Sequence, residues 1–445
     1  MTPLILSTLL FVSGDTPPAE APKLVPATRV EEKEAMEAHK KARPRLPAPP
    51  EGEGRGVNNG RFRQYYLGHL GGGFGTGTGT GGAGGNRTGA GRDPAMTLDN
   101  TFKVKLFWIA SRANNCYYCL GHQEQKLAVA GVADDEIAAL DTDWSRFTEA
   151  EKTAFAFTKK LTQTPHLIGD ADLAAMKKHY KPNEVLEIVV TVAGYNATNR
   201  WTDGLNIPAE ASGQFRREDG KEGPDLSKFT TPTSAKFKDI VSLVAPLPEK
   251  CVKGSPPVWP ARPALEDRAT VEAHLKAAKD RQAVLPVADA KAAAELWKAD
   301  GAAPQWVRLL AVFPRSGETR VSGMKNAAEK GLLPARVQAE IAWTAARVDR
   351  AWYALAVAKA RLKALGFTDD QIFALDGDAK DLPESERLAI AFARKLSMAP
   401  ATVSDTDVEG LRKHFKDKEV AEIVHNVCNA AFLNRVTETA RLPLD

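Results

Sequence analysis

The sequence has few cysteines, few aromatic residues and almost no excess of either charge. Four cysteines in 445 residues are too few for a disulfide-stapled scaffold. The 60 basic and 56 acidic residues leave a formal net charge of only +4, and no basic stripe with interleaved aromatic residues occurs, so a nucleic-acid partner is not expected. Alternation of β-branched residues, the usual sign of strands, is nearly absent. The sequence therefore predicts an all-α protein.

Long apolar runs are also scarce. Apart from the run between Leu4 and Val12, nothing approaches the roughly 20 apolar residues of a membrane-spanning helix. This run has the length of a signal-peptide core, and residues 1–14 therefore predict an exported protein. No Lys or Arg precedes the run, and the alternatives are an uncleaved anchor, a mis-assigned start and a cytoplasmic protein.

What the chain does contain is a long internal repeat. Residues 151–208 and 386–443 align without a gap, with 22 identities in 58 positions, far more than chance gives. Residues of the first copy that recur in the second include Tyr118, Lys160, Pro165, Asp170, His179, Glu187, Asn199, Arg200 and Thr202. Because both copies keep them, we expect most to build the fold. Asn199 and Arg200 are the pair best suited to a functional or interface role.

The two copies differ where reactive side chains gather. The first contains a Cys-x-x-Cys pair, Cys116 and Cys119, followed by His122 and Gln123. The residues at these four positions of the second copy are Ala351, Ala354, Val357 and Ala358. The first copy thus carries reactive side chains at these positions, and the second, called the blank copy below, does not. This contrast favours a functional role for the cysteines over a packing role.

Composition divides the rest of the chain. The expected segments are a proline- and glycine-rich linker or exposed arm at 15–95, a first helical repeat at 96–208, a polar linker at 209–256, and a second repeat without the cysteine pair at 257–445. The glycine-rich run at 71–92 lacks the strand, the helix and the Gly-Lys-Ser/Thr of a phosphate loop. Basic and aromatic residues at 61–66 are expected to dock the arm onto the globular part.

The cysteine segment has the composition of a redox dithiol. On a helix, Cys116, Cys119, His122 and Gln123 would share a stripe about 120° wide. Two thiols one turn apart can close a disulfide, and the positive end of a helix favours a thiolate. A neighbouring histidine can relay the proton. One sulfur would then attack a peroxide or disulfide and the other would resolve the product.

Three other interpretations of the pair are possible. Covalent haem requires a histidine directly after the second cysteine, where this chain has Leu120. A structural zinc requires four ligands, and only Cys116, Cys119 and His122 are near. The third alternative is an inert pair buried against the other repeat. We expect neither a metal nor a cofactor.

These residues resemble the alkylhydroperoxidase D-like and carboxymuconolactone decarboxylase superfamily, in particular its peroxidase-related branch. The resemblance is carried by Ser111-Arg112-Ala113-Asn114-x-Cys116-x-Tyr118-Cys119 with nearby His122, by Ala130-Gly131, and by Asn199-Arg200-x-Thr202-Asp203-Gly204-Leu205-x-Ile207. It covers 99–208 well and 300–443 as a degenerate copy. It implies two tandem alkylhydroperoxidase D-like helical units, of which only the first is redox-active.

The resemblance also implies roles. Cys119 is expected to attack and Cys116 to resolve, with His122 assisting proton transfer; Gln123, Asn199 and Arg200 are accessory candidates. The chain departs from the family at two positions. Gln123 stands where the family has its histidine, four residues after the second cysteine. Val104 stands where the family has a glutamate.

The sequence thus predicts a thiol-dependent peroxidase or oxidoreductase that reduces a hydroperoxide or a disulfide and is regenerated by an external dithiol. Family members assemble through these helices, so an internal pseudo-dimer or a homo-oligomer is expected. The alternative is a non-enzymatic binding or assembly module that keeps only the fold. The sequence names neither the oxidant nor the reductant.

Overall fold

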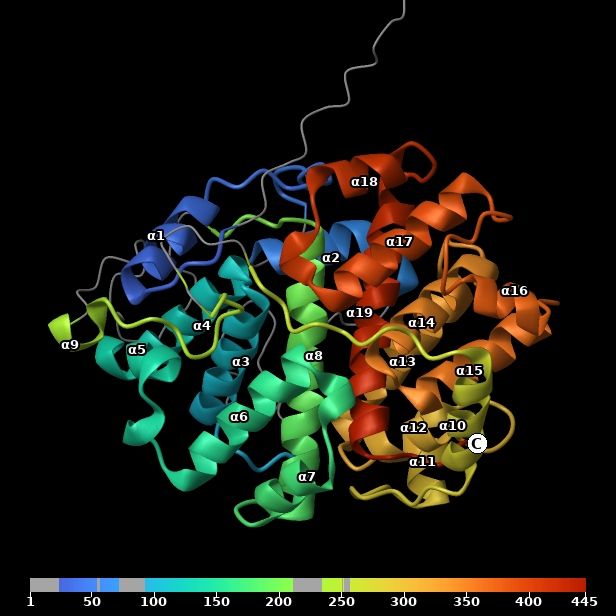
Figure 1. Cartoon of the computed structure of the whole chain (residues 1–445), viewed down its shortest axis with the longest axis horizontal. Coiled ribbons are helices and arrows are strands. Elements are labelled where there is room, and N and C mark those ends of the chain that lie inside the picture. Colours follow the sequence, from blue (N-terminus) through green and yellow to red (C-terminus); the bar gives the residue numbers. More distant parts are fainter. Residues whose placement is uncertain (1–23, 54–56, 72–92, 211–233, 250, 252–256) are drawn as a thin grey trace, which may run out of the picture.

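The structure is a computed structural model that describes residues 24–53, 57–71, 93–210, 234–249, 251 and 257–445. All regular elements within these ranges are helices (Figure 1), which confirms the all-α class. No helix among them is both long enough and apolar enough to cross a bilayer. The predicted signal segment at 1–14 and the glycine-rich run from 72 onward lie outside the described residues.

Two series of helices share one order. The first comprises α3 (Asn100–Asn114), α4 (Tyr117–Val129), α5 (Asp134–Thr142), α6 (Glu149–Gln163), α7 (Asp170–Lys177) and α8 (Pro182–Gly204). The second comprises α14 (Ala335–Asp349), α15 (Trp352–Ala364), α16 (Asp369–Ala374), α17 (Glu384–Met398), α18 (Asp405–Arg412) and α19 (Asp417–Thr439). Each helix of the second series begins at the position that the sequence repeat pairs with the start of its counterpart.

The remaining helices lie outside the two series. They are α1 (Arg29–His39), α2 (Asn58–Leu67), α9 (Ala235–Lys238), α10 (Arg268–Lys279), α11 (Ala290–Trp297), α12 (Gln305–Leu310) and α13 (Pro314–Lys330). Short 3-10 turns are η1 (Gly68–Leu70), η2 (Trp144–Arg146), η3 (Pro165–Leu167) and η4 (Pro400–Thr402). The sequence pattern did not indicate α13, since most of its residues are polar and only three are buried.

Helix ends follow the local sequence in both series. Gly131 and Gly366 adopt φ values of 85° and 89° after α4 and α15, a left-handed conformation that glycine adopts without strain. Thr148 caps α6 through its side chain, and Glu151 returns the bond to the cap backbone. These local signals determine where the helices end and begin, and therefore where the chain turns between successive helices.

Helices α8 and α19 lie side by side through the middle of the molecule (Figure 1). Each sends an arginine across to the other series. Arg200 of α8 donates to the carbonyl of Ser397 in α17 at 2.7 Å, and Arg435 of α19 donates to the carbonyl of Thr162 in α6 at 3.1 Å. Since Ser397 and Thr162 are equivalent positions of the two series, the contacts are reciprocal.

The two arginines differ in their carboxylate partners. Arg435 lies 3.3 Å from Oδ2 of Asp349. Burial would raise the pKa of Asp349, but the charges of Arg435 and Arg262 outweigh burial and lower that pKa. Arg200 instead bonds the backbone and side-chain oxygens of Asn196. Burial and the charge of Arg435 lower the pKa of Arg200 to about 9.

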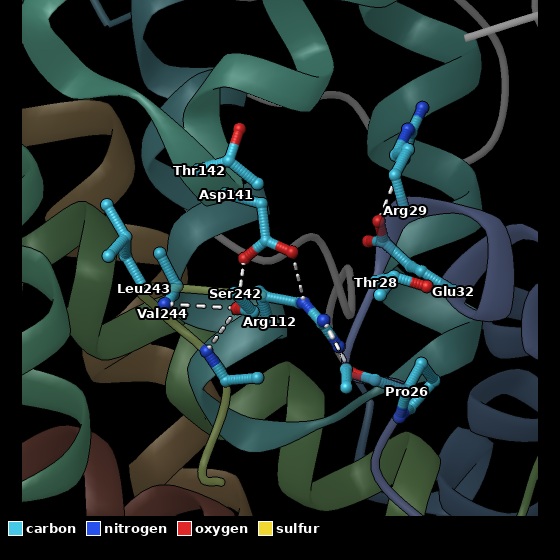
Figure 2. A network of polar contacts seen from close by, with 12 residues as sticks. Pro26, Thr28, Arg29, Glu32, Arg112, Asp141, Thr142, Ser242, Leu243 and Val244 are labelled. Carbon is cyan, nitrogen blue, oxygen red and sulfur yellow. Dashed lines mark hydrogen bonds and ion pairs between the residues drawn. The ribbon is translucent and has the colours of Figure 1, made fainter. Parts of the chain in front are cut away.

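Of the predicted arm at 15–95, the described residues near Pro26 are not exposed but are bonded to the first series. Arg112 of α3 donates to the carboxylate of Asp141 of α5 at 3.0 Å and to the carbonyl of Pro26 at 2.7 Å (Figure 2). Two residues of the linker between the series also bind Asp141. The hydroxyl of Ser242 donates to the carboxylate of Asp141, and the N–H of Leu243 donates to the backbone carbonyl of Asp141 at 2.7 Å. Because Arg112 and Asp141 are fully buried, both connecting segments are held against the first series.

We predict that Arg435→Met destabilises the fold more than Arg200→Met. Removing Arg435 leaves the buried Asp349 with the more distant Arg262, 3.6 Å away, as its ionic partner. We expect a loss of about 3 kcal/mol, at the lower end for breaking a buried pair. Arg200→Met loses hydrogen bonds but leaves no carboxylate without its principal partner, and about 1–2 kcal/mol is expected. Urea unfolding measures both, and equal losses would contradict the assignment.

Candidate functional site

The cysteine pair lies at the corner between α3 and α4. Asn115 ends α3 in a left-handed conformation with φ 56°, and the N–H of Cys116 bonds the carbonyl of Ser111 at 2.9 Å. Cys116 is extended and caps α4, which begins at Tyr117. Only Cys119 is therefore on the helix, in its first turn, which differs from the expectation that both cysteines lie on one helical stripe.

Both thiols contact the same hydroxyl group. The sulfur of Cys116 lies 3.1 Å, and that of Cys119 3.3 Å, from Oγ1 of Thr202 on α8. Because one oxygen atom is within hydrogen-bond distance of both sulfurs, the two thiols are close neighbours. Thr202 directs its own proton to the carbonyls of Thr198 and Asn199, both 3.1 Å away. Its oxygen can therefore accept from the thiols, and rotation of the hydroxyl would let it donate to a thiolate.

The pair is reduced and almost completely enclosed. Cys116 is 0% and Cys119 2% exposed, and neither is in a disulfide. The second series keeps the backbone but not the sulfur: Ala351 has φ −90° and ψ 87°, against −92° and 96° for Cys116. Thr437 occupies the position of Thr202 and bonds the carbonyl of Leu433. The blank copy therefore offers a matched internal control.

His122 is paired with a carboxylate that the sequence does not mark. Its Nδ1 lies 2.8 Å from the carbonyl of Tyr118 and its Nε2 lies 2.8 Å from Oε2 of Glu210. Since a carbonyl only accepts, Nδ1 carries a proton. The contact between Nε2 and the carboxylate has the length of a charge-assisted hydrogen bond, so the two groups face one another as a polar pair.

Glu210 connects α4 with the N-terminal segment. Its Oε1 accepts from the hydroxyl of Tyr118 at 3.2 Å and from the backbone N–H of Asn58, while Asn59 donates to the Tyr118 hydroxyl at 2.9 Å. Burial alone would raise the pKa of Glu210, but the charge of His122 and the hydrogen bonds outweigh it and lower that pKa. Glu210 follows the repeat, in the polar linker, where no motif marks it.

The accessory candidates lie at three different places. Gln123 donates to the carbonyl of Cys119 at 3.2 Å, one turn along α4. Asn199 donates to Ser111 at 3.2 Å and accepts from Asn114 at 2.8 Å, which fastens α8 to the end of α3 behind the cysteines. Arg200 is directed away, to the boundary between the two series. The structure thus brings Cys116 and Cys119 to Thr202, with Gln123 and Asn199 supporting their backbone.

Two cations act on Cys119 electrostatically. Lys126 lies two turns further along α4; burial lowers its pKa to about 8, and the charge of Cys119 partly opposes this. Arg63 comes from α2 in the N-terminal segment, and its guanidinium stacks on the ring of Trp201 at 4.7 Å. Burial lowers the pKa of Arg63, opposed by Cys428, Cys119 and Tyr118. Residues 61–66 therefore do contact the globular part, as expected, and reach the cysteine site.

No family model matches this chain, and no curated protein matches it either. Within the described ranges, no group of three or more His, Cys, Asp or Glu side chains is arranged as a metal site. The dithiol corner, its threonine and the His122–Glu210 pair therefore have to be interpreted from their own geometry.

We predict that Thr202→Val slows alkylation of Cys119 at neutral pH about tenfold. Valine has nearly the shape of threonine but lacks the hydroxyl that can donate to a Cys119 thiolate. A hydrogen bond to a charged group contributes roughly 1.5 kcal/mol, which corresponds to about a tenfold change in the thiolate population. Iodoacetamide labelling followed by mass spectrometry measures the rate. Thr437→Val, the same change in the blank copy, should leave the rate unaltered. An equal rate in Thr202→Val and the wild type would exclude this role.

The lowered pKa of Glu210 predicts a pH-dependent contribution to stability. The ionised carboxylate stabilises the fold at pH values above the ordinary glutamate pKa, and this contribution is lost as the pH falls through the lowered pKa. Glu210→Gln should therefore be less stable than the wild type at pH 7, and the difference should vanish in acid. Urea unfolding between pH 3 and 7 measures it, with exposed Glu409→Gln as control. A pH-independent difference would contradict the ion pair.

Proposed function

We propose that this chain is a thiol-dependent peroxidase or oxidoreductase of the alkylhydroperoxidase D-like kind, with redox activity confined to the first helical series. The observation that carries the proposal is the convergence of both sulfurs on the hydroxyl of Thr202 at the start of α4. The blank copy keeps the corner and the threonine but replaces both cysteines. Its alanines support a dithiol that is functional rather than required for packing.

Cys119 is the better nucleophile of the two. It lies in the first turn of α4, where the unpaired N–H groups carry partial positive charge, whereas Cys116 precedes the helix. Lys126 adds a second positive charge. Its charge favours a thiolate at Cys119, and the charge of Cys119 in turn partly opposes the lowering of the Lys126 pKa by burial.

The proposed reaction has two steps. The Cys119 thiolate attacks the terminal oxygen of a hydroperoxide; the O–O bond breaks, the alkoxide leaves and takes a proton, and the sulfur becomes a sulfenic acid. The Cys116 thiol then attacks this sulfur, which forms the disulfide and releases water. With a disulfide as substrate, Cys119 forms a mixed disulfide that Cys116 resolves. An external dithiol returns the pair to the reduced state by two successive exchanges and is itself oxidised to a disulfide.

His122 and Glu210 hold a proton close to the dithiol. Gln123 and Val104 stand where the family has a histidine and a glutamate, and the ion pair of His122 with Glu210 supplies both groups from other positions. Because both ring nitrogens of His122 already have partners, we assign it to positioning and proton storage rather than to direct contact with the sulfur.

The competing proposal is a non-enzymatic binding or assembly module. It is favoured by the near-complete burial of both sulfurs, which a substrate must reach, and by the blank second copy. The reciprocal arginines between the two series fit an internal pseudo-dimer under either proposal.

The decisive test follows peroxide consumption with a dithiol reductant. Cys119→Ser should abolish turnover. Without the reductant, Cys116→Ser should consume one equivalent of peroxide and form no disulfide between positions 116 and 119, which peptide mapping detects. Cys251→Ser is the matched control and should retain full activity. Undiminished turnover in Cys119→Ser, or two wild-type thiols that remain inert to peroxide until the protein unfolds, would favour the binding module.

A further inference from the structure

Two arginines from helices outside the two series meet on one face of α19. Helix α2 packs on α19, and α13 packs both on α19 and on η1, the turn after α2. Arg63 of α2 stacks on Trp201 at 4.7 Å, and Arg320 of α13 stacks on Phe432 of α19 at 4.1 Å. An aromatic ring that is buried thus covers one face of each guanidinium group. The N–H groups at the edge of the guanidinium group are left for other contacts.

The face of α19 between them is defined by helical spacing. His425, Cys428 and Phe432 are separated by three and four residues, so they lie on one side of the helix. All three are buried, with exposures of 7%, 1% and 0%. Arg63 itself is only 8% exposed. Both cationic groups interact electrostatically with the thiol of Cys428, and Arg63 also interacts with Cys119.

Arg63, which is buried, and Arg320, which is half-buried, differ in their partners from most of the buried arginines of the described residues. Direct contacts with carboxylates are made by Arg29, Arg112, Arg347 and Arg435. Arg200 has no such contact, but its two terminal nitrogens donate to carbonyl and amide oxygens of the chain. Among the described residues, Arg63 makes one hydrogen bond, from Nε to the side-chain oxygen of Asn59 at 3.0 Å. Neither Arg63 nor Arg320 contacts a carboxylate within the ranges the structure describes, and buried charge without a counter-charge is costly.

Electrostatics agree with this picture. Burial and the charge of Arg63 lower the pKa of Arg320 to about 10. Burial and the charges of both arginines lower the pKa of His425 to about 3, so this ring is neutral at physiological pH. The two guanidinium groups repel one another. An anion bound between their edges would remove that repulsion.

We propose that Arg63 and Arg320 form a binding site for a small organic carboxylate beside Cys119. A planar carboxylate matches guanidinium edges by paired hydrogen bonds, and the rings of Trp201 and Phe432 suit an apolar body attached to it. A phosphate dianion would bring more charge than this apolar surface can solvate. The site combines helices from outside the repeats with α8 and α19, so neither helical series could form it alone.

The identity of the substrate rests on the proposed function. If Cys119 reduces a hydroperoxide or a disulfide, the preferred substrate carries a carboxylate that the two arginines hold while its reactive bond points toward the sulfur. The binding site itself does not depend on turnover, and it can be tested in a protein that lacks the thiol.

The first experiment measures binding of benzoate and of its neutral analogue benzamide by calorimetry. Wild type and Cys119→Ser should bind benzoate saturably and at least tenfold more tightly than benzamide. Arg63→Gln and Arg320→Gln should each lose at least tenfold in benzoate affinity. Arg61→Gln is the matched control, because Arg61 lies on the same helix but bonds carbonyls at 49, 50 and 53 and should not alter binding.

Thermal unfolding without ligand separates binding from misfolding. Removing one of two mutually repelling cations should leave the variants folded, with a melting temperature equal to or above that of the wild type. Equal affinities for benzoate and benzamide, or benzoate binding that survives both substitutions, would overturn the site. Binding of inorganic phosphate without binding of benzoate would overturn its assignment to carboxylates.

A second experiment tests the position beside Cys119. Iodoacetate carries a carboxylate and iodoacetamide does not, so the ratio of their alkylation rates at Cys119 reports on a nearby anion site. The ratio should fall at least fivefold in Arg63→Gln and in Arg320→Gln. Benzoate binding with an unchanged ratio would place the site away from Cys119. If the wild-type protein binds benzoate but has no peroxidase activity, the proposed function is rejected and the anion site is retained.

Discussion

One turn of α8 determines how the site is assembled. Four consecutive residues of this helix contact four different neighbours: Asn199 fastens α3, Arg200 reaches α17, Trp201 lies under Arg63 of α2, and Thr202 meets both sulfurs. Because all four are buried, α8 cannot rotate without breaking several of these contacts at once. The short distance from Thr202 to the thiols is therefore set by the packing of the whole molecule and not by the cysteine segment alone.

Buried charge organises the parts of the chain that the repeat does not cover. Arg112 and Asp141 hold the residues around Pro26 and Ser242 on the first series (Figure 2). Glu210 likewise draws the end of the first series to α4 and α2. In each case several hydrogen bonds offset the desolvation of a charged group, and the same bonds fix an irregular segment. Arg63 and Arg320 have no such set of partners among the described residues, and the proposed anion site is argued from this difference.

The sequence predicted what depends on local signals and on the repeat. Periodicity, caps and the constant offset between the two copies indicated the helix order, and the contrast of Cys116 and Cys119 with Ala351 and Ala354 located the dithiol. Glu210 and Arg320 could not be predicted, because they lie in segments without periodicity or motif. The basic and aromatic residues at 61–66 predicted that this segment docks, but the contact of Arg63 with Trp201 depends on tertiary packing. The sequence pattern also placed Cys116 on a helix, whereas the left-handed Asn115 turns the chain so that Cys116 becomes the cap.

The blank copy is more than a remnant of duplication. It supplies α19, whose face of His425, Cys428 and Phe432 lies against Arg63 and Arg320, and whose Arg435 anchors the first series. A single unit would keep Thr202 and both thiols but would lose this face and the apolar wall beside α8. The second copy, which has alanines at the cysteine positions, therefore contributes packing surface and an anchoring arginine to the first copy.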